Sequence, residues 1–366
     1  MPKWDDLIGQ FQATVFQDLN WLKNWWDFSY KDNFIPYIIQ IKDEEKTIGI
    51  FPLYIDSIRF ARMTFRILKP MGSGISDYLI PILSKNYAAD DLLYMALKAI
   101  YEDRANWDYI EWEDVPEDSE LSRFLDSHHL KRFILERNIE EVCPYFNIDG
   151  GIDELKQKIS KKFLSEISRV ERKLKREGTL EFSKVTKEEE IIPIMNKFFE
   201  LHCKRWKNTT TPSEFRYEEK RNFLLSAAKS LFKSNLLHLR YIRFNEEIMV
   251  VHFGISDGIK SYLYLHAINI DFRKYSPGSL LVYYLILEAE QEGFQVVDFL
   301  RGDEGYKERW NTKEKFNIKY EFFNHSLKSR LFRFIFHTHK NQQFIKRLSY
   351  IHRSILGIFG FFINNF

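Results

Sequence analysis

Residues 260–300 carry the feature that most constrains how this chain can fold. An alternating apolar segment, 260–267, is typical of a strand, 280–291 has helical periodicity, and 295–300 is a short apolar strand. In a strand–helix–strand unit, the two strands pair in parallel within one sheet, and the helix forms the crossover connection between them. The sequence therefore predicts an α/β fold organised around this unit.

The turn between that strand and that helix is suited to an anion. Free N–H groups of a first helical turn and the helix dipole both favour negative charge at this position. Glycine permits a close backbone approach, hydroxyls donate hydrogen bonds, and basic side chains add positive charge. We therefore expect a phosphate-bearing donor to bind Arg273, Lys274, Tyr275, Ser276, Gly278 and Ser279.

Length and composition favour a two-domain globular protein. The chain has 366 residues, of which 45% are hydrophobic, and a net charge of +2, so any basic surface must be local. Its two cysteines have no metal-type spacing and fit a reducing compartment. The start has no signal-peptide pattern, and the longest clean apolar run, 355–363, is too short to span a bilayer. The expected location is the cytoplasm.

The two halves repeat one order of elements. Strands are predicted at 34–42, 47–58 and 63–70, then a helix at 88–103 and a strand at 108–112. The second half has strands at 236–242, 248–255 and 260–267 before the helix and strand described above. We expect tandem α/β units, an N-terminal domain at 1–150 and a C-terminal domain at 151–325. The first-half helix starts with two acids, Asp90 and Asp91, so the donor site is assigned to the second unit.

Two basic segments have two readings each. Nine of the residues from Lys156 to Arg176 are Lys or Arg in a predicted helix at 154–176, either a solvated helix face or a rail for an anionic substrate such as tRNA. The tail, 326–366, has basic and apolar residues and no acid. It is either a basic amphipathic segment on the inner face of a membrane or a helical hairpin docked on the protein.

Several motifs, in order along residues 15–320, resemble those of one enzyme superfamily. They are Gly72-Ser73-Gly74-Ile75-Ser76-Asp77-Tyr78, the basic helix ending at Gly178, Leu201-His202-Cys203-Lys204-Arg205-Trp206, Tyr275-Ser276-Pro277-Gly278-Ser279-Leu280-Leu281, and Asp298-Phe299-Leu300-Arg301-Gly302-Asp303 with Tyr306, Lys307 and Trp310. The chain resembles GNAT-type acyltransferases of the CelD-like family, associated with cellulose and polysaccharide loci. These in turn are related to the FemABX aminoacyl transferases.

The resemblance implies tandem GNAT domains, each a mixed, mainly antiparallel sheet flanked by helices, with acyl-CoA such as acetyl-CoA bound by the second. The family's Arg/Gln-x-x-Gly-x-Gly/Ala turn becomes Arg273-x-x-Ser276-x-Gly278 here, and Pro277 removes one N–H donor. That departure weakens the case for CoA in particular. FemABX relatives use aminoacyl-tRNA, so the fold alone does not name the donor.

Acyl transfer to an amine needs a base, donors for the oxyanion and an acid for the leaving group. Asp298 ends a buried strand, where it is either catalytic or paired with Arg301. Asp303 or His266 is the candidate base, His266 sharing one strand face with Tyr262 and Tyr264. Tyr306 is the candidate acid and Lys307 a ligand for phosphate or carboxylate, whereas Trp310 is expected to pack.

The candidate acceptor residues are His202, Arg205 and Trp206 on a helix, and Asp77 and Tyr78 from the first domain, with a packing role as the alternative for each. No zinc spacing, serine-hydrolase elbow or Walker loop occurs, so no metal is expected. The sequence therefore predicts an N-acyltransferase acting on an amine such as an amino-sugar of a surface polysaccharide. The alternatives are an aminoacyl-tRNA-dependent transferase and an inactive GNAT-fold interaction protein.

Overall fold

A computed structural model describes residues 10–29, 34–60, 62–127, 133–148 and 151–337. These residues form two compact units. Unit 1 contains the chain up to Glu141 and the segment from Phe316 onward, and unit 2 contains Val142–Lys315. The sequence-based boundaries, 1–150, 151–325 and 326–366, differ from this division because two long strands each begin in one unit and end in the other. Most of the tail, 338–366, lies outside the described residues.

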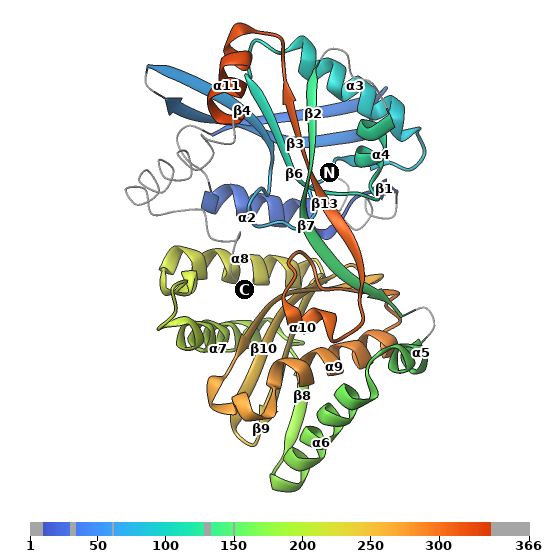
Figure 1. Ribbon diagram of the computed structural model, residues 1–366, viewed down its shortest axis with the longest axis vertical. Helices are drawn as coiled ribbons and strands as arrows, with labels where there is room; N and C mark the ends of the chain where they lie inside the picture. Colours follow the sequence, from blue (N-terminus) through green and yellow to red (C-terminus); the bar gives the residue numbers. More distant parts are fainter. Residues whose placement is uncertain (1–9, 30–33, 61, 128–132, 149–150, 338–366) are drawn as a thin grey trace. The chain divides into compact units, whose positions relative to one another are not determined.

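Unit 1 is built on mainly antiparallel strands with helices packed on both faces (Figure 1). Its strands β2 (Ile35–Asp43), β3 (Lys46–Phe60) and β4 (Met63–Pro70) form a meander, and α3 (Ala89–Glu102) then crosses to β6 (Tyr109–Pro116), which pairs with β4 in parallel. The remaining elements are β1 (Phe11–Gln12), η1 (Val15–Gln17), α2 (Leu19–Ser29), β5 (Ile82–Ser84), α4 (Glu120–Ser127), β7 (Ile134–Asn147), β13 (Lys313–Phe323) and α11 (Leu327–His337).

Unit 2 repeats this order of elements in its own strands. Strands β9 (Leu237–Phe244), β10 (Glu247–Ser256) and β11 (Lys260–Ile268) form a meander, and α9 (Pro277–Gln291) crosses to β12 (Val296–Asp298), which pairs with β11 in parallel. The remaining elements are α5 (Gly151–Lys158), α6 (Lys161–Glu177), β8 (Leu180–Lys184), α7 (Glu188–Trp206), η2 (Glu214–Arg216), α8 (Glu218–Lys233), η3 (Ile270–Tyr275) and α10 (Gly305–Glu308).

The predicted order of three strands, a helix and a parallel return strand is confirmed in both units. The α/β class, with mixed and mainly antiparallel sheets flanked by helices, is also confirmed. The predicted helix at 154–176 is wrong as one element, because it breaks into α5 and α6 around Ser160. Strand β7, rich in charged residues, was not predicted.

Apolar residues fill one face of the unit 1 sheet. Trp107, Trp112 and Phe124 are fully buried there with residues of α3 and α4. Burial of apolar side chains such as these is the main driving force of folding.

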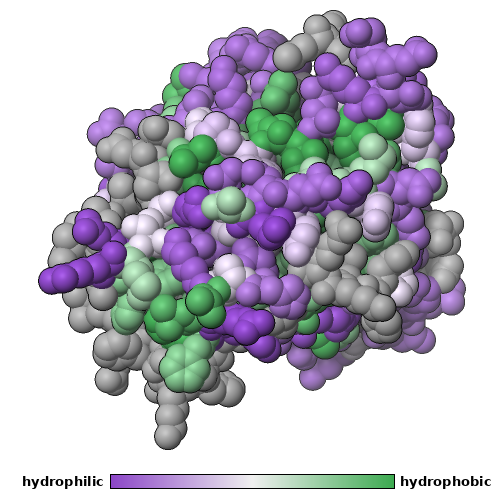
Figure 2. All heavy atoms as spheres, turned by 90° about the horizontal axis from the view of Figure 1, so that it is seen from above, coloured by the Kyte–Doolittle hydropathy of each residue, from purple (hydrophilic) through white to green (hydrophobic). Residues whose placement is uncertain are grey.

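The face in Figure 2 is mostly hydrophilic, with hydrophobic side chains in separate groups. No described helix combines the length and hydrophobicity needed to span a lipid bilayer.

The other face of the unit 1 sheet carries a buried charge network. Glu111 on β6 contacts Lys319 on β13 and Lys69 on β4, each at 2.5 Å. Burial alone would raise the pKa of Glu111, but these two lysines hold it well below its usual value. Glu140 on β7 is different: burial and the nearby Glu113 raise its pKa from 4.5 to about 7.

Glu140 should therefore destabilise unit 1 as pH rises. Its carboxyl binds a proton more tightly in the folded state, so its stabilising contribution is complete below about pH 4.5 and is lost as pH passes 7. Replacing it with Gln, which still accepts the Asp114 N–H bond, should raise the free energy of unfolding at pH 8 by roughly 1–2 kcal/mol, allowing for its partial exposure.

Urea unfolding at pH 5 and pH 8 measures this difference. Glu102→Gln, at a carboxylate whose side chain is 63% exposed, is the control and should change neither value by more than about 0.5 kcal/mol. A Glu140→Gln variant as pH-dependent as the parent chain would contradict the assignment.

Candidate functional site

The predicted donor turn lies where β11 leads into α9. Asn269 caps η3, and Ser276, at φ 45°, reverses the chain in the left-handed region before Pro277 opens α9. Proline suits a first helical position because no N–H partner is needed there. Arg273, Lys274 and Ser276 are exposed, so the turn offers positive charge and a hydroxyl to solvent.

Gly278 lies close to the strand that precedes this turn. A Cβ there would lie 3.1 Å from Cδ1 of Ile268, the last residue of β11. Tyr275 instead anchors the turn: it is buried, and its hydroxyl donates to Glu177 Oε2 at 3.1 Å. Ser279 uses its N–H to bond the Ser276 carbonyl at 3.0 Å. Binding of a donor by these six residues stays a prediction.

A β-bulge on β11 changes which residues share a face. Leu265 pairs with Phe253 and Tyr262 with Ile255, so two residues of β11 lie opposite the single Gly254 of β10. Simple alternation predicted Tyr262 on the same face as His266. That prediction is wrong, because the extra residue reverses the alternation between them.

His266 lies on the sheet face covered by α9, two residues before Ile268. Its ring stacks on that of His252 with centroids 4.9 Å apart. Burial, followed by the charges of Lys307 and Arg205, lowers the pKa of His266 to about 3. The imidazole is therefore neutral at pH 7.

Asp298, at the end of β12, is fully buried. Lys315 Nζ donates to Asp298 Oδ2 at 2.8 Å, and the Leu300 N–H donates to Oδ1 at 2.9 Å. The sequence suggested Arg301 as a pairing partner; Lys315, seventeen residues away, is a partner that it did not suggest. Such pairing compensates the cost of a buried carboxylate.

Lys307 organises the loop after β12. Its buried Nζ donates to the Arg301 carbonyl at 2.9 Å and the Gly302 carbonyl at 3.1 Å, and lies 2.7 Å from Glu304 Oε2. The loop contains Leu300 at φ 59°, which is uncommon for a side chain of this kind. The Lys307 ammonium is thus bonded to the loop itself, whereas the sequence suggested that Lys307 binds a ligand.

The two acid–base candidates on this loop are open to solvent. Asp303 is exposed, and 39% of Tyr306 is exposed. Burial around its hydroxyl and the Glu304 carboxylate raise the pKa of Tyr306, while Arg205 opposes the rise. Tyr306 therefore keeps its proton at neutral pH.

The end of α7 contributes the predicted acceptor residues. His202 Nδ1 lies 2.8 Å from Ser213 Oγ, and its pKa is lowered to about 4 by burial and by Arg205. The Arg205 guanidinium lies 5.1 Å from the centre of the Trp206 ring. Arg205 also influences the pKa values of Tyr306 and His266. Within unit 2, the charge of Arg205 on α7 therefore acts on His266 of β11 and on Tyr306 of α10.

Asp77 and Tyr78 belong to unit 1, where both are buried. The Asp77 carbonyl accepts from Asn317 Nδ2 at 2.6 Å, and the Tyr78 carbonyl accepts from Gln17 Nε2 at 2.8 Å. Their assignment to an acceptor site stays a prediction. Trp310, expected to pack, is fully buried against Phe163.

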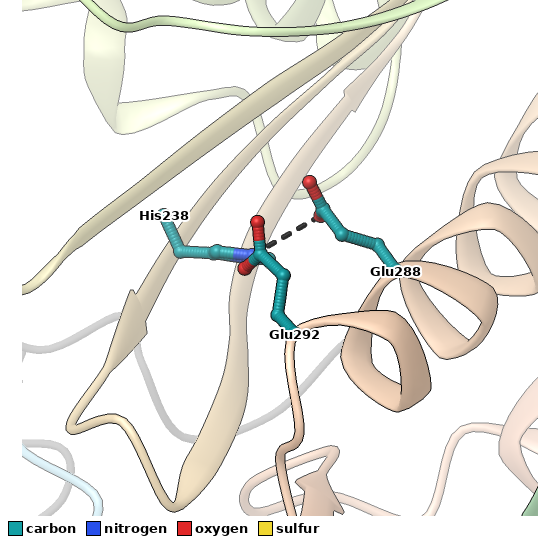
Figure 3. Close-up of side chains that lie close together, drawn as sticks. All are labelled: His238, Glu288 and Glu292. Atoms are coloured by element: carbon teal, nitrogen blue, oxygen red, sulfur yellow. Dashed lines mark ion pairs between the residues drawn. The ribbon is translucent and has the colours of Figure 1, made fainter.

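One group of described residues has the spacing of metal ligands: His238, Glu288 and Glu292 place ligand atoms within 4.8 Å of one another (Figure 3). Arg240 already occupies it, since its Nε donates to both Glu288 oxygens at 2.7 and 2.9 Å. A divalent cation would have to displace this guanidinium, so the donor set does not suit a metal.

Sequence reasoning missed His238, His252, Arg240 and Glu288. His238, His252 and His266 are spaced fourteen residues apart. Adjacent strands of a meander run in opposite directions, so equal spacing alone does not place residues beside each other, and His238 is paired with Gly254 rather than with His252. The pattern becomes informative only once the strand pairing is known.

Comparison with known proteins supports the fold of unit 2. Residues 161–308 match the family model described as an acetyltransferase (GNAT) domain, so the chain contains a GNAT-type domain. No curated protein sequence matches the chain significantly.

Solved structures resemble almost the whole chain at low identity. The crystal structure of FemX is 12% identical with a TM-score of 0.62, over 90% of this chain and 97% of that chain. The C-terminal domain of a putative lysylphosphatidylglycerol synthetase from Agrobacterium fabrum is 12% identical with a TM-score of 0.51, over 89% and 92%. A conserved protein of unknown function from Bacteroides thetaiotaomicron is 12% identical with a TM-score of 0.52, over 83% of this chain and 90% of that chain. These likenesses concern the fold alone.

Replacing Lys307 with Met should destabilise unit 2. The change leaves the Glu304 carboxylate and the backbone carbonyls without their shared donor, and breaking a largely buried pair in this way costs roughly 2–4 kcal/mol. Urea unfolding of the full chain measures the loss. The double variant Lys307→Met/Glu304→Gln should recover part of it, and Lys313→Met, at an exposed lysine, is the control. A loss in the free energy of unfolding below about 0.5 kcal/mol would show that Lys307 does not stabilise the loop.

Proposed function

We propose that the GNAT domain of unit 2 transfers an acyl group from acyl-CoA to a primary amine. The observation that carries this proposal is the turn at the start of α9. Exposed Arg273, Lys274 and Ser276 surround a helix N-terminus that Gly278 brings against the end of β11. This arrangement suits the pyrophosphate of CoA.

The residues available for the transfer lie in the same domain. The reaction forms a bond from the amine nitrogen to the carbonyl carbon and breaks the carbon–sulfur bond of the thioester. The leaving thiolate takes one proton. The acceptor ammonium gives up two, one before its nitrogen attacks and one afterwards. Tyr306 holds its proton at neutral pH and is the acid in this proposal. Asp303, which is exposed, and His266, which is neutral, are the two bases.

The polar cluster at the end of α7 would bind the acceptor. His202, Arg205 and Trp206 offer an imidazole, a guanidinium and an indole on one helix end, and the charge of Arg205 acts on Tyr306. A guanidinium and an aromatic face suit a hydroxyl-rich or acidic acceptor, such as an amino-sugar of a cell-envelope polysaccharide. The resemblance to CelD-like proteins supports the same acceptor class.

An aminoacyl-tRNA donor is the second candidate. The observation that favours it is α6, whose Lys162, Arg169 and Arg172 are exposed along one helix. The fold also resembles FemX, and FemABX relatives use such donors. An inactive interaction protein is the third reading.

Saturating acetyl-CoA should stabilise the full chain against heat. At about 100 times its Kd a ligand adds about 2.7 kcal/mol, which raises the melting temperature of a domain of this size by roughly 5–10 °C. Gly278→Glu should abolish the shift, because its side chain would crowd Ile268 and add negative charge at the turn.

The control for that experiment is Lys313→Gln, an equal change of charge at an exposed position away from the turn. It should keep the shift. If acetyl-CoA gave no shift, the CoA assignment would be wrong. Transfer from aminoacyl-tRNA with an activity that falls steeply with salt would then establish the second candidate.

Peripheral membrane contact through α11 is proposed as well. Leu327, Leu331 and Phe334 recur at helical spacing and are 85%, 37% and 70% exposed, beside Lys328 and Arg330. Leu327→Glu/Phe334→Glu should reduce co-sedimentation with anionic vesicles at least tenfold, whereas Met95→Glu, 51% exposed on α3, should not. Equal binding by both variants would show that α11 does not bind lipid.

A further inference from the structure

Three histidines form a row across the unit 2 sheet. His266 on β11 and His252 on β10 are paired residues whose rings stack with centroids 4.9 Å apart. The His252 ring in turn meets His238 of β9 edge to face at 5.7 Å. All three lie on the face that α9 covers, and His238 Nε2 approaches Glu288 Oε2 at 3.2 Å (Figure 3).

The row is polar and buried, and its contacts with described polar groups are few: His238 has the Glu288 carboxylate, and His252 has the backbone of Leu265. His252 is fully buried, His238 is 2% exposed, and all six ring nitrogens of the three residues are inaccessible. Leaving such groups unpaired costs free energy, and native proteins pair them through ordered water where no protein partner exists. A core position of this kind would normally hold an aliphatic side chain.

The backbone makes room for this row. Gly254 lies beside His252 on the same face, and a Cβ there would be 2.2 Å from His252 Nε2. The same glycine is the backbone partner of His238 and lies at the β-bulge. A glycine inside a strand costs stability unless close packing requires it. Here the glycine makes space for one of the three imidazoles.

The two ends of the row have opposite charge. Lys307 and Arg205 influence His266 at one end. Glu288 and Glu292 lie at the His238 end, and the Glu292 side chain is 31% exposed and paired with Lys184. Arg240 offsets part of this negative charge by pairing with Glu288. A proton on the row is therefore repelled at His266 and attracted at His238.

We infer that His266, His252 and His238 form a proton path that carries the proton released by the amine across the sheet to Glu288, Glu292 and solvent. This inference rests on the proposed acyl transfer. An ammonium and a thioester give an amide, a thiol and one proton. The proton passes from the ammonium to neutral His266 and on to His252 and His238. Because stacked rings do not hydrogen-bond each other, bridging water carries it between the imidazoles. It then reaches the carboxylates, each imidazole returning to its neutral form.

The low pKa of His266 keeps the imidazole neutral between turnovers, as a proton-transfer group requires. Burial, the other two rings and Arg240 also lower the pKa of His252, while burial lowers that of His238 against the opposite effect of Glu288. No ring therefore holds the proton for long, and the carboxylates complete its transfer. His252 and His238 are positioning and relay residues here, because neither touches the reacting atoms.

Hydrogen exchange of the ring protons tests the path without any substrate. In the full chain labelled with ¹⁵N-histidine, the His266 ring N–H should exchange with water rapidly despite its burial. His238→Phe should slow that exchange at least tenfold by closing the outer end. Phe294→Leu, which changes the packing beside His238 but removes no titratable group, should leave it unchanged. His238→Leu repeats the test should the larger ring disturb the fold.

Turnover links the path to the reaction. With acetyl-CoA and glucosamine as probes, His252→Phe should lower kcat at least tenfold with little change in the KM for acetyl-CoA. Imidazole should restore turnover to His252→Ala, whereas pyrrole, which has the same shape but no basic nitrogen, should not.

Each result decides one statement. Slow His266 exchange in the parent chain, or exchange unaffected by either His238 variant, would show a dry stack and overturn the path. Normal exchange with full turnover in His252→Phe would show that the proton leaves elsewhere, as it would with Asp303 as base. Absence of turnover in the parent chain, together with no thermal shift by acetyl-CoA, would contradict the proposed acyl transfer but leave the exchange result standing.

Discussion

The parallel pairing of β11 with β12 is the constraint on which the candidate site depends. Parallel neighbours need a crossover, and α9 supplies it. The chain must therefore turn at the end of β11 and begin a helix there, which places Arg273, Ser276 and Gly278 beside the end of β11. The return strand ends in Asp298, and the loop that carries Asp303 and Tyr306 follows it. One backbone pairing thus positions the donor turn and the loop.

Charged residues in this protein have very different tasks. Lys307 and Lys315 stabilise the fold. Lys307 donates to the loop carbonyls, and Lys315 pairs with Asp298. Arg205 and Arg273 remain exposed. The sequence alone does not show whether a basic residue stabilises the fold or remains exposed. Its environment decides whether it stabilises the fold or stays available for a ligand.

Much of the fold could be predicted from the sequence, because both meanders and both crossovers depend on local patterns. Alternation identified β9, β10 and β11, and the Asp257-Gly258 turn between the last two is present, with Gly258 at φ 81°. The candidate site could be predicted only in part. Residues on one element, such as Arg205 and Trp206, were found together, but Lys315, a partner of Asp298, comes from another strand.

The failures have a common physical cause. Strand β7 has a charged sequence because one of its faces joins the network around Glu140, so it lacks the apolar alternation of a half-buried strand. The bulge opposite Gly254 moved Tyr262 to the face away from His266. Both depend on contacts between distant segments, which a single sequence does not display.

The exchange of strands between the units also sets an order of assembly during synthesis. Residues 316–323 of β13 pair with β6, yet they are made only after all of unit 2 has been translated. The contiguous segment Val142–Lys315 is complete first, whereas unit 1 lacks a strand of its sheet until near the end of the chain. A ribosome that stalls before Phe316 would release a protein with the GNAT domain fully translated and an unpaired edge on β6.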